Sequence, residues 1–131
     1  MTTELSMLVY STLLLVVLVF IQAQAAIKAQ GVKAMAGPRD GLPEPSVFQA
    51  RTKRVVDNHR EGLTLFAPLV LAAAVAHVSN QWTVLGAELF FAGRVVHAIC
   101  YLIGFALRPL AWVVGMAGTL MIAAVLLGLL R

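Results

Sequence analysis

The stretch Arg51-Thr-Lys-Arg-Val-Val-Asp-Asn-His-Arg-Glu61 organises the chain, because it is densely charged and an apolar run follows it at once from Gly62. If the stretch is helical, four polar side chains repeat at i, i+3, i+7 and i+10 and share one helix face. They are Arg51, Arg54, Asn58 and Glu61. The pattern predicts a stripe of two guanidinium groups, an amide and a carboxylate at the mouth of a membrane-spanning segment.

Composition places the rest of the chain in a membrane. Of 131 residues, 60% are hydrophobic and 12% are charged, and the mean hydropathy is +0.88. Soluble domains average about 45–50% apolar and about 25% charged residues. The net charge of +4 does not indicate a nucleic-acid partner, because seven of the ten Lys and Arg residues lie in the single juxtamembrane segment 28–60. The positive-inside rule explains such a segment better.

Four apolar segments predict an all-α fold, a four-helix bundle in the membrane formed by one domain over residues 1–131. The predicted spans cover about 5–27, 62–78, 82–107 and 110–130. The first has 23 uncharged residues, enough to cross a hydrocarbon core of about 30 Å. An acidic residue, Glu4, precedes it, which is wrong for a signal peptide and favours a retained helix.

The segment 28–61 between the first two spans is predicted to be a loop followed by a helical extension. Its Gly- and Pro-rich part, 37–45, cannot lie inside a helix, and Ser46 is the expected N-cap of the next one. Pro68 is expected to kink that helix. Four spans put both termini on one side, and the opposite side carries eight of the nine Lys and Arg near the membrane ends. The loop side is therefore predicted to be cytoplasmic.

The third span contains ionisable groups that a lipid-facing anchor would not have. Arg94 falls near mid-depth and needs a carboxylate, because an unpaired charge there costs upward of about 2.5 kcal/mol. The spacing i, i+3, i+7 and i+14 places four side chains on one stripe: Arg94, His97, Tyr101 and Arg108. If this stripe faces the first one, Glu61 pairs with Arg94 and the other groups surround a cavity open to the cytoplasm.

The predicted cavity has the chemistry of a site for a small zwitterionic ligand with excess negative charge, such as a peptide. Arginines at positions 51, 54 and 108 bind carboxylates and can stabilise a ligand thiolate. The carboxylate of Glu61 could hold an ammonium group. No metal site is predicted, because the three histidines do not share a helix face with a carboxylate.

Several other polar residues receive simpler interpretations. His59 and His77 are expected at the surface or the membrane interface, and Cys100, which as a single cysteine excludes an intramolecular disulfide, as a packed core thiol. Glu88 has no clear role beyond a pair with His77. Glycines in the last span, Gly115, Gly118 and Gly128, are expected to allow close helix contact.

The paired pattern Arg54-x-x-x-Asn58-x-x-Glu61 and Arg94-x-x-His97-x-x-x-Tyr101 resembles the MAPEG family, the membrane-associated proteins in eicosanoid and glutathione metabolism. The resemblance covers about 48–108 well, and the four-span layout covers the whole chain. It implies a homotrimer of four-helix subunits, with glutathione held as a co-substrate between adjacent subunits and membrane lipid around them.

The resemblance also implies roles for individual residues. Arg54, Asn58, Glu61 and Tyr101 would contact glutathione, and Arg94 would be a buried residue linked to the site. Arg108 matches the arginine that stabilises the thiolate in leukotriene C4 synthase-like members, and would be the catalytic residue. His97 is similar to the histidine of the prostaglandin E synthase branch. Gly62 stands where a tyrosine often follows the glutamate, so one contact is missing.

The mixed pattern is similar to the small bacterial members of the family, which implies a location in the bacterial inner membrane. The leading hypothesis is a membrane glutathione S-transferase or peroxidase that acts on lipophilic electrophiles. The alternative is a non-catalytic trimeric membrane protein that keeps the polar stripes for assembly. A third hypothesis, a small exporter, would need Glu61 or Glu88 in a transport path.

Overall fold

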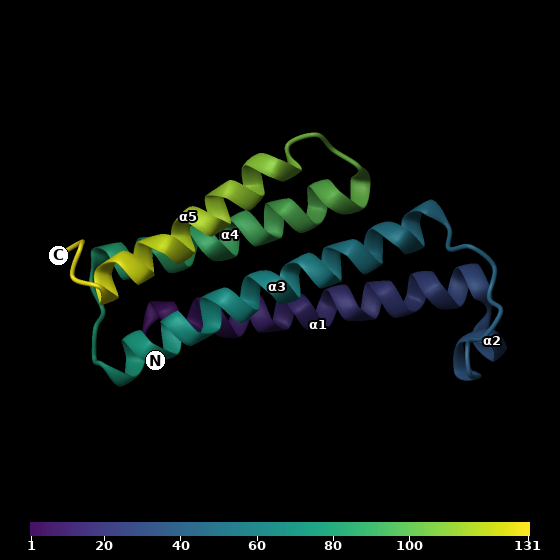
Figure 1. Ribbon diagram of the computed structural model, residues 1–131, viewed down its shortest axis with the longest axis horizontal. Helices are drawn as coiled ribbons and strands as arrows, with labels where there is room; N and C mark the ends of the chain where they lie inside the picture. The colour runs from purple at the N-terminus through teal and green to yellow at the C-terminus, as the bar shows by residue number, and fades with distance from the viewer.

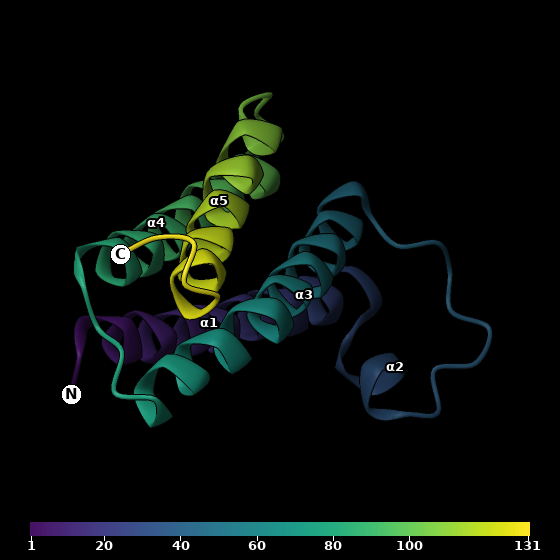
Figure 2. The same ribbon diagram turned by 60° about the vertical axis from the view of Figure 1, so that its left-hand side comes forward.

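The computed structural model describes all 131 residues as five helices without strands, so the all-α prediction is confirmed. The helices are α1 (Thr3–Gln30), α2 (Val32–Ala36), α3 (Val47–Val75), α4 (Gln81–Ile103) and α5 (Arg108–Leu126). The main pairings are α4 with α5 and α1 with α3 (Figures 1 and 2). Both termini lie at one end of the molecule, and α2 with its following loop lies at the other.

Side-chain caps explain where the long helices begin. The Ser46 hydroxyl accepts a hydrogen bond from the backbone N–H of Gln49 at 3.1 Å, so the predicted N-cap of α3 is confirmed. At α4, the Asn80 side chain accepts from the N–H of Thr83, and the Thr83 hydroxyl accepts from the N–H of Asn80. This reciprocal pair satisfies two backbone donors that a helix start leaves free.

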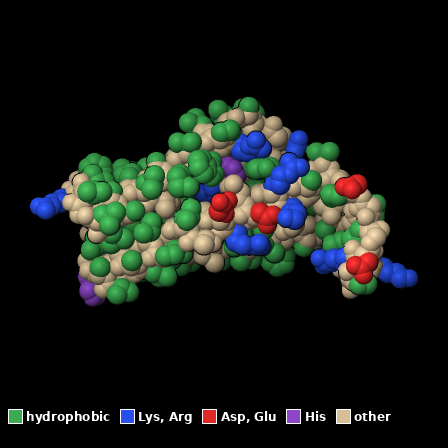
Figure 3. Space-filling view, in the orientation of Figure 1, with side chains coloured by type: hydrophobic (Ala, Val, Ile, Leu, Met, Phe, Trp, Pro, Cys, Tyr) green, Lys and Arg blue, Asp and Glu red, His purple; other side chains and the backbone are tan.

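Three helices are long and apolar enough to cross a membrane, namely α1, α4 and α5. The helix α3 does not join them, because its first half is the charged stretch that precedes Gly62. Its apolar half continues unbroken through Pro68 and ends at Val75, three residues before the predicted limit of that span. A fourth crossing over 62–78 therefore stays a prediction. On the face that Figure 3 shows, charged side chains gather in the half that includes the loop, and the other half is mainly hydrophobic.

The predicted third span is too long at its C-terminal end. The helix α4 ends at Ile103, because Gly104 adopts a left-handed conformation with φ +76° and closes the helix with its N–H. Arg108 is consequently the first residue of α5. The prediction that Arg108 continues the stripe of Arg94 along one helix is wrong.

The core lies between the two helix pairs. Phe66 of α3 and Phe90 of α4 stack with their ring centroids 3.8 Å apart. A second apolar cluster joins Leu18 of α1 to Val56 of α3 and Ala98 of α4. These contacts hold the polar half of α3 against α4, where the candidate site lies.

Glycines let α4 and α5 approach each other closely, as the sequence predicts for Gly115 and Gly118. A Cβ added to Gly93 would lie 2.8 Å from the backbone nitrogen of Gly115, and one added to Gly118 would overlap the carbonyl oxygen of Gly86. Gly128 does not join this contact. It lies beyond the end of α5 with φ +73° and no neighbouring atom within 4 Å of such a Cβ, so its predicted role is wrong.

A buried carboxylate ties the start of α1 to the turn before α4. Glu4 is only 2% exposed and accepts hydrogen bonds from the hydroxyl of Ser79 at 2.9 Å and from the hydroxyl of Thr83. Its other carboxylate oxygen is buried without a partner. This residue therefore has a packing role that its place in front of an apolar run does not reveal.

Candidate functional site

A cleft of about 470 Å³ opens where the first half of α3 meets the turn between α4 and α5. Its volume lies within the range of roughly 300–1,000 Å³ typical of small-molecule sites. Its lining combines three arginines with aromatic and small residues: Arg51, Arg54, Cys100, Tyr101, Gly104, Phe105, Ala106, Arg108 and Pro109. Four of the predicted site residues, Arg51, Arg54, Tyr101 and Arg108, therefore share one cleft.

The three arginines of the cleft have no acidic partner in the chain. The only ion pairs join Asp57 to Lys53 at 2.7 Å and to Arg60 at 3.6 Å, on another face of α3. None of the three cleft guanidinium groups makes a hydrogen bond within the chain either. The cleft consequently carries three fixed positive charges whose hydrogen-bond donors are free for an anion.

Local backbone and ring contacts place two of these arginines. The guanidinium of Arg51 lies against Gly104, where a Cβ would be 2.9 Å from a terminal nitrogen of the arginine. Gly104 is needed for its positive φ, which strains any residue with a side chain. The guanidinium carbon of Arg108 lies 4.6 Å from the ring centroid of Tyr101, which is a cation–π contact. Arg108 therefore still lies beside Tyr101, although it extends from the start of α5 and not from α4.

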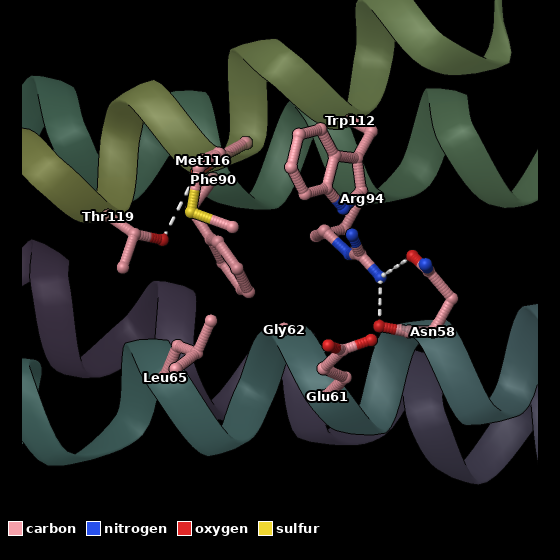
Figure 4. Close-up of a pocket in the computed structure, with 10 residues that line it drawn as sticks. Asn58, Glu61, Gly62, Leu65, Phe90, Arg94, Trp112, Met116 and Thr119 are labelled. Carbon is pink, nitrogen blue, oxygen red and sulfur yellow. Dashed lines mark hydrogen bonds between the residues drawn. The ribbon is translucent and has the colours of Figure 1, made fainter.

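A second, much smaller hollow of about 30 Å³ lies one turn further along α3, between α3, α4 and α5 (Figure 4). It has room for water and not for a peptide. Three predicted site residues line it, and they are Asn58, Glu61 and Arg94. Arg94 extends from α4 towards α3, where one terminal nitrogen donates to the Asn58 side-chain oxygen at 2.8 Å and to the Asn58 backbone oxygen at 2.6 Å.

The predicted ion pair between Glu61 and Arg94 is not formed. The two side chains line the same hollow, but Glu61 is exposed and lies beyond ion-pair distance, while Arg94 is 3% exposed and bonds only to uncharged groups. Arg94 reaches α3 nearer its start, at Asn58, and lies over Gly62. A Cβ at Gly62 would be 3.1 Å from the guanidinium carbon.

His59 contradicts the prediction of a surface position. It is 1% exposed, its Nε2 lies 2.8 Å from the carbonyl oxygen of Ser11, and its Nδ1 lies 3.3 Å from the Nε of Arg94. A signal for its burial is present in the sequence. His59 continues the apolar face of α3 at helical spacing, four residues after Val55 and four before Leu63.

Of the remaining residues that the sequence singled out, Cys100 agrees with its prediction, whereas His97 and the pair of Glu88 with His77 do not. His97 is buried and lines neither hollow, with its ring edge-on to Tyr101 at a centroid distance of 5.5 Å, so it is not part of the cleft surface. Cys100 is buried, as predicted. Glu88 and His77 are both exposed and form no ion pair, so the suggested pair is wrong.

The sequence model of the MAPEG family matches residues 6–128. Comparison with curated proteins and with solved structures gave no match. The family match covers both polar stripes, the cleft and all four long helices.

Proposed function

This chain belongs to the MAPEG family of membrane proteins, which includes glutathione-dependent enzymes, and we propose that it binds glutathione and uses its thiol against lipophilic electrophiles. The observation that carries the proposal is the cleft with three arginines and no acidic partner. Unpaired guanidinium groups at a membrane protein's polar end attract a ligand with excess carboxylate. Glutathione has two carboxylates and one ammonium group, and it fits that charge balance.

Arg108 is the residue that we propose to act on the thiol. Its guanidinium is exposed and oriented by the Tyr101 ring. A positive charge close to a ligand thiol lowers the pKa of that thiol and raises the thiolate fraction at neutral pH. The thiol proton leaves to solvent. The thiolate sulfur then forms a bond to the electrophilic carbon while the bond to the leaving group breaks. With a hydroperoxide substrate, the same thiolate would form an S–O bond to one peroxide oxygen while the O–O bond breaks and the alkoxide leaves as an alcohol. A second glutathione would then convert the sulfenic acid to glutathione disulfide and water.

An apolar groove beside the cleft supports a lipophilic second substrate. The groove has a volume of about 220 Å³ and is lined by Ala92, Gly93, Val96, Leu107, Leu110, Ala111 and Val114. It shares the first turn of α5 with the arginine cleft, because Leu107 and Leu110 flank Arg108 and Pro109. A substrate dissolved in the bilayer could thus approach the thiolate from the membrane side. We propose further that the cleft is completed by an adjacent subunit in a homotrimer.

The competing proposal is a non-catalytic member in which the polar groups serve only to hold the helices together. The hydrogen bonds of Arg94 to Asn58 and His59 favour it, because they are satisfied without any ligand. It does not account for the free hydrogen-bond donors of the three cleft arginines, which make no ion pair within the chain. We therefore prefer the glutathione-dependent enzyme.

Thiolate absorbance distinguishes the two proposals. Adding glutathione to the purified protein at neutral pH should give a thiolate difference absorbance, which Arg108→Ala should abolish. Arg60→Ala is the matched control, because Arg60 lies on α3 outside the cleft and next to Asp57. If the unmodified protein gives no thiolate signal and glutathione does not raise its melting temperature, the enzyme proposal is wrong.

A further inference from the structure

A second cleft, larger than the arginine cleft, lies between the last third of α1 and the start of α3. Its volume is about 680 Å³, and it has no part in the proposed glutathione reaction. The end of α1 and the start of α3 lie together at the loop end of the molecule (Figure 1). The residues that line this cleft are Phe20, Ile21, Gln24, Ala25, Lys28, Ala29, Ser46 and Phe48.

The α1 wall of this cleft is one stripe of the helix. Its residues recur in pairs four positions apart, at 20–21, 24–25 and 28–29, and residues four apart share a helix face. The stripe changes character along its length. It begins at Phe20 inside the apolar run and ends at Lys28, roughly 12 Å further along the axis at about 1.5 Å per residue. The wall is therefore apolar at one end and cationic at the other.

The charge of Lys28 has no partner within the chain. Its ammonium group is exposed and makes neither an ion pair nor a hydrogen bond, and no acidic residue lines the cleft. A cation beside an apolar wall favours a ligand that has both an anionic group and a hydrocarbon part.

Aromatic side chains leave apolar surface open on both walls. Phe20 on α1 is 65% exposed and Phe48 on α3 is 46% exposed. The helix α1 is long and apolar enough to cross a membrane, and its uncharged run ends just before Lys28. A crossing by α1 puts Phe20 beside the acyl chains and Lys28 near the headgroups. The two ends of the cleft thus match the two parts of a phospholipid.

We propose that this cleft binds one phospholipid from the leaflet on the loop side, with its phosphate at Lys28 and the upper part of an acyl chain along Phe20 and Phe48. The lipid is an anionic one, such as a phosphatidylglycerol, because the lining has no carboxylate to hold the ammonium group of a zwitterionic headgroup. Such a lipid would bind whether or not the arginine cleft takes glutathione, since the two clefts share no residue.

Lipids that differ in one part at a time test this assignment. Each is added to the purified protein in a neutral detergent, and binding is followed by the rise in melting temperature. Dioctanoyl phosphatidylglycerol should bind with a dissociation constant about fivefold lower than that of dioctanoyl phosphatidylcholine, the ratio expected for one lysine near an anionic lipid. Glycerol 3-phosphate, which has the phosphate without the chains, should leave the melting temperature unchanged.

Two pairs of variants test the two ends of the cleft. Lys28→Ala should remove the preference for phosphatidylglycerol, and Lys28→Arg should keep it. Lys33→Ala is the matched control, because Lys33 is exposed on α2 outside the cleft. Phe20→Ser should weaken the binding of both lipids to the same extent, since it shortens the apolar wall and leaves the charge in place. Its control is Leu120→Ser, at an exposed position of α5.

Each contrary result identifies a different occupant. If phosphatidylcholine binds as tightly as phosphatidylglycerol, or if Lys33→Ala removes the preference as fully as Lys28→Ala, Lys28 does not select the headgroup and the inference is wrong. If glycerol 3-phosphate stabilises the protein as well as the lipid does, the cleft takes a free phosphate and not a lipid. If neither lipid raises the melting temperature, no lipid binds, and a loss of oligomers in Phe20→Ser would then show that a second copy of the chain covers the cleft.

Discussion

At the scale of the residue, Arg94 shows how a buried charge is accommodated without an ion pair. It donates to a side-chain amide, to a backbone carbonyl and to a neutral imidazole. Hydrogen bonds to a charged group are worth about 1.5–3 kcal/mol each, so three of them can offset much of the cost of burial. Glu61 forms no ion pair, although it lines the same hollow as Arg94.

Glu4 is a second buried ionisable residue, and its contribution to stability can be measured with two variants. Glu4→Ala should lower the free energy of unfolding by about 1–3 kcal/mol, because the hydroxyl donors of Ser79 and Thr83 lose their acceptor inside the protein. Glu4→Gln keeps one side-chain oxygen and should retain most of the stability. Thermal unfolding in detergent measures both, with Glu44→Ala in the exposed loop as the control. Equal melting temperatures for all four proteins would contradict the role given to Glu4.

At the scale of the element, the seam between α4 and α5 depends on missing side chains. Gly86 and Gly93 of α4 meet Gly118 and Gly115 of α5, and a Cβ added to Gly86, Gly93 or Gly118 would clash with backbone atoms across the seam. Because this seam fixes where α5 begins relative to α4, it also sets the distance of Arg108 from Tyr101. Close helix contact thus positions the predicted catalytic residue.

At the seam between α4 and α5, Gly→Ala substitutions should destabilise the protein, which is the opposite of their usual effect in a helix. Gly→Ala inside a helix normally stabilises it by about 1 kcal/mol. Here Gly93→Ala or Gly118→Ala should instead lower the free energy of unfolding by about 1–3 kcal/mol or more, because the new methyl group meets rigid backbone atoms. Ala117→Val on the exposed face of α5 is the control and should be nearly neutral. Unfolding in detergent gives the sign, and a stabilised Gly118→Ala would refute the close contact.

At the scale of the whole molecule, the charge asymmetry predicts how the protein sits in its membrane. The termini lie at one end and the basic loop at the other (Figure 1). Positively charged segments stay on the cytoplasmic side, so the loop is expected there.

Single-cysteine labelling tests this orientation. In a Cys100→Ala background, Asp40→Cys in the loop should react with a membrane-impermeant reagent only from the cytoplasmic side, and Thr2→Cys only from the opposite side. Both positions are exposed. Labelling of both from the same side would contradict a membrane crossing by α1.

The sequence alone determined the class of protein and the residue types of the candidate site. Hydropathy specifies long apolar helices, caps such as Ser46 specify where they begin, and helical spacing selects Arg51, Arg54, Asn58 and Glu61 as one polar stripe. These are local properties, because they depend on residues within a few turns of each other.

Only the tertiary structure decided which polar groups meet. The left-handed Gly104 ends α4 early and moves Arg108 to another helix, yet packing returns it to Tyr101. Burial turned His59 from an expected surface residue into a link between α1 and α4. Arg94 bonds to the Asn58 amide and not to the expected carboxylate of Glu61, because its partner depends on how far α4 is offset along α3. The residue spacing within one helix does not specify this offset. Side-chain volumes and the glycines between the helices set it.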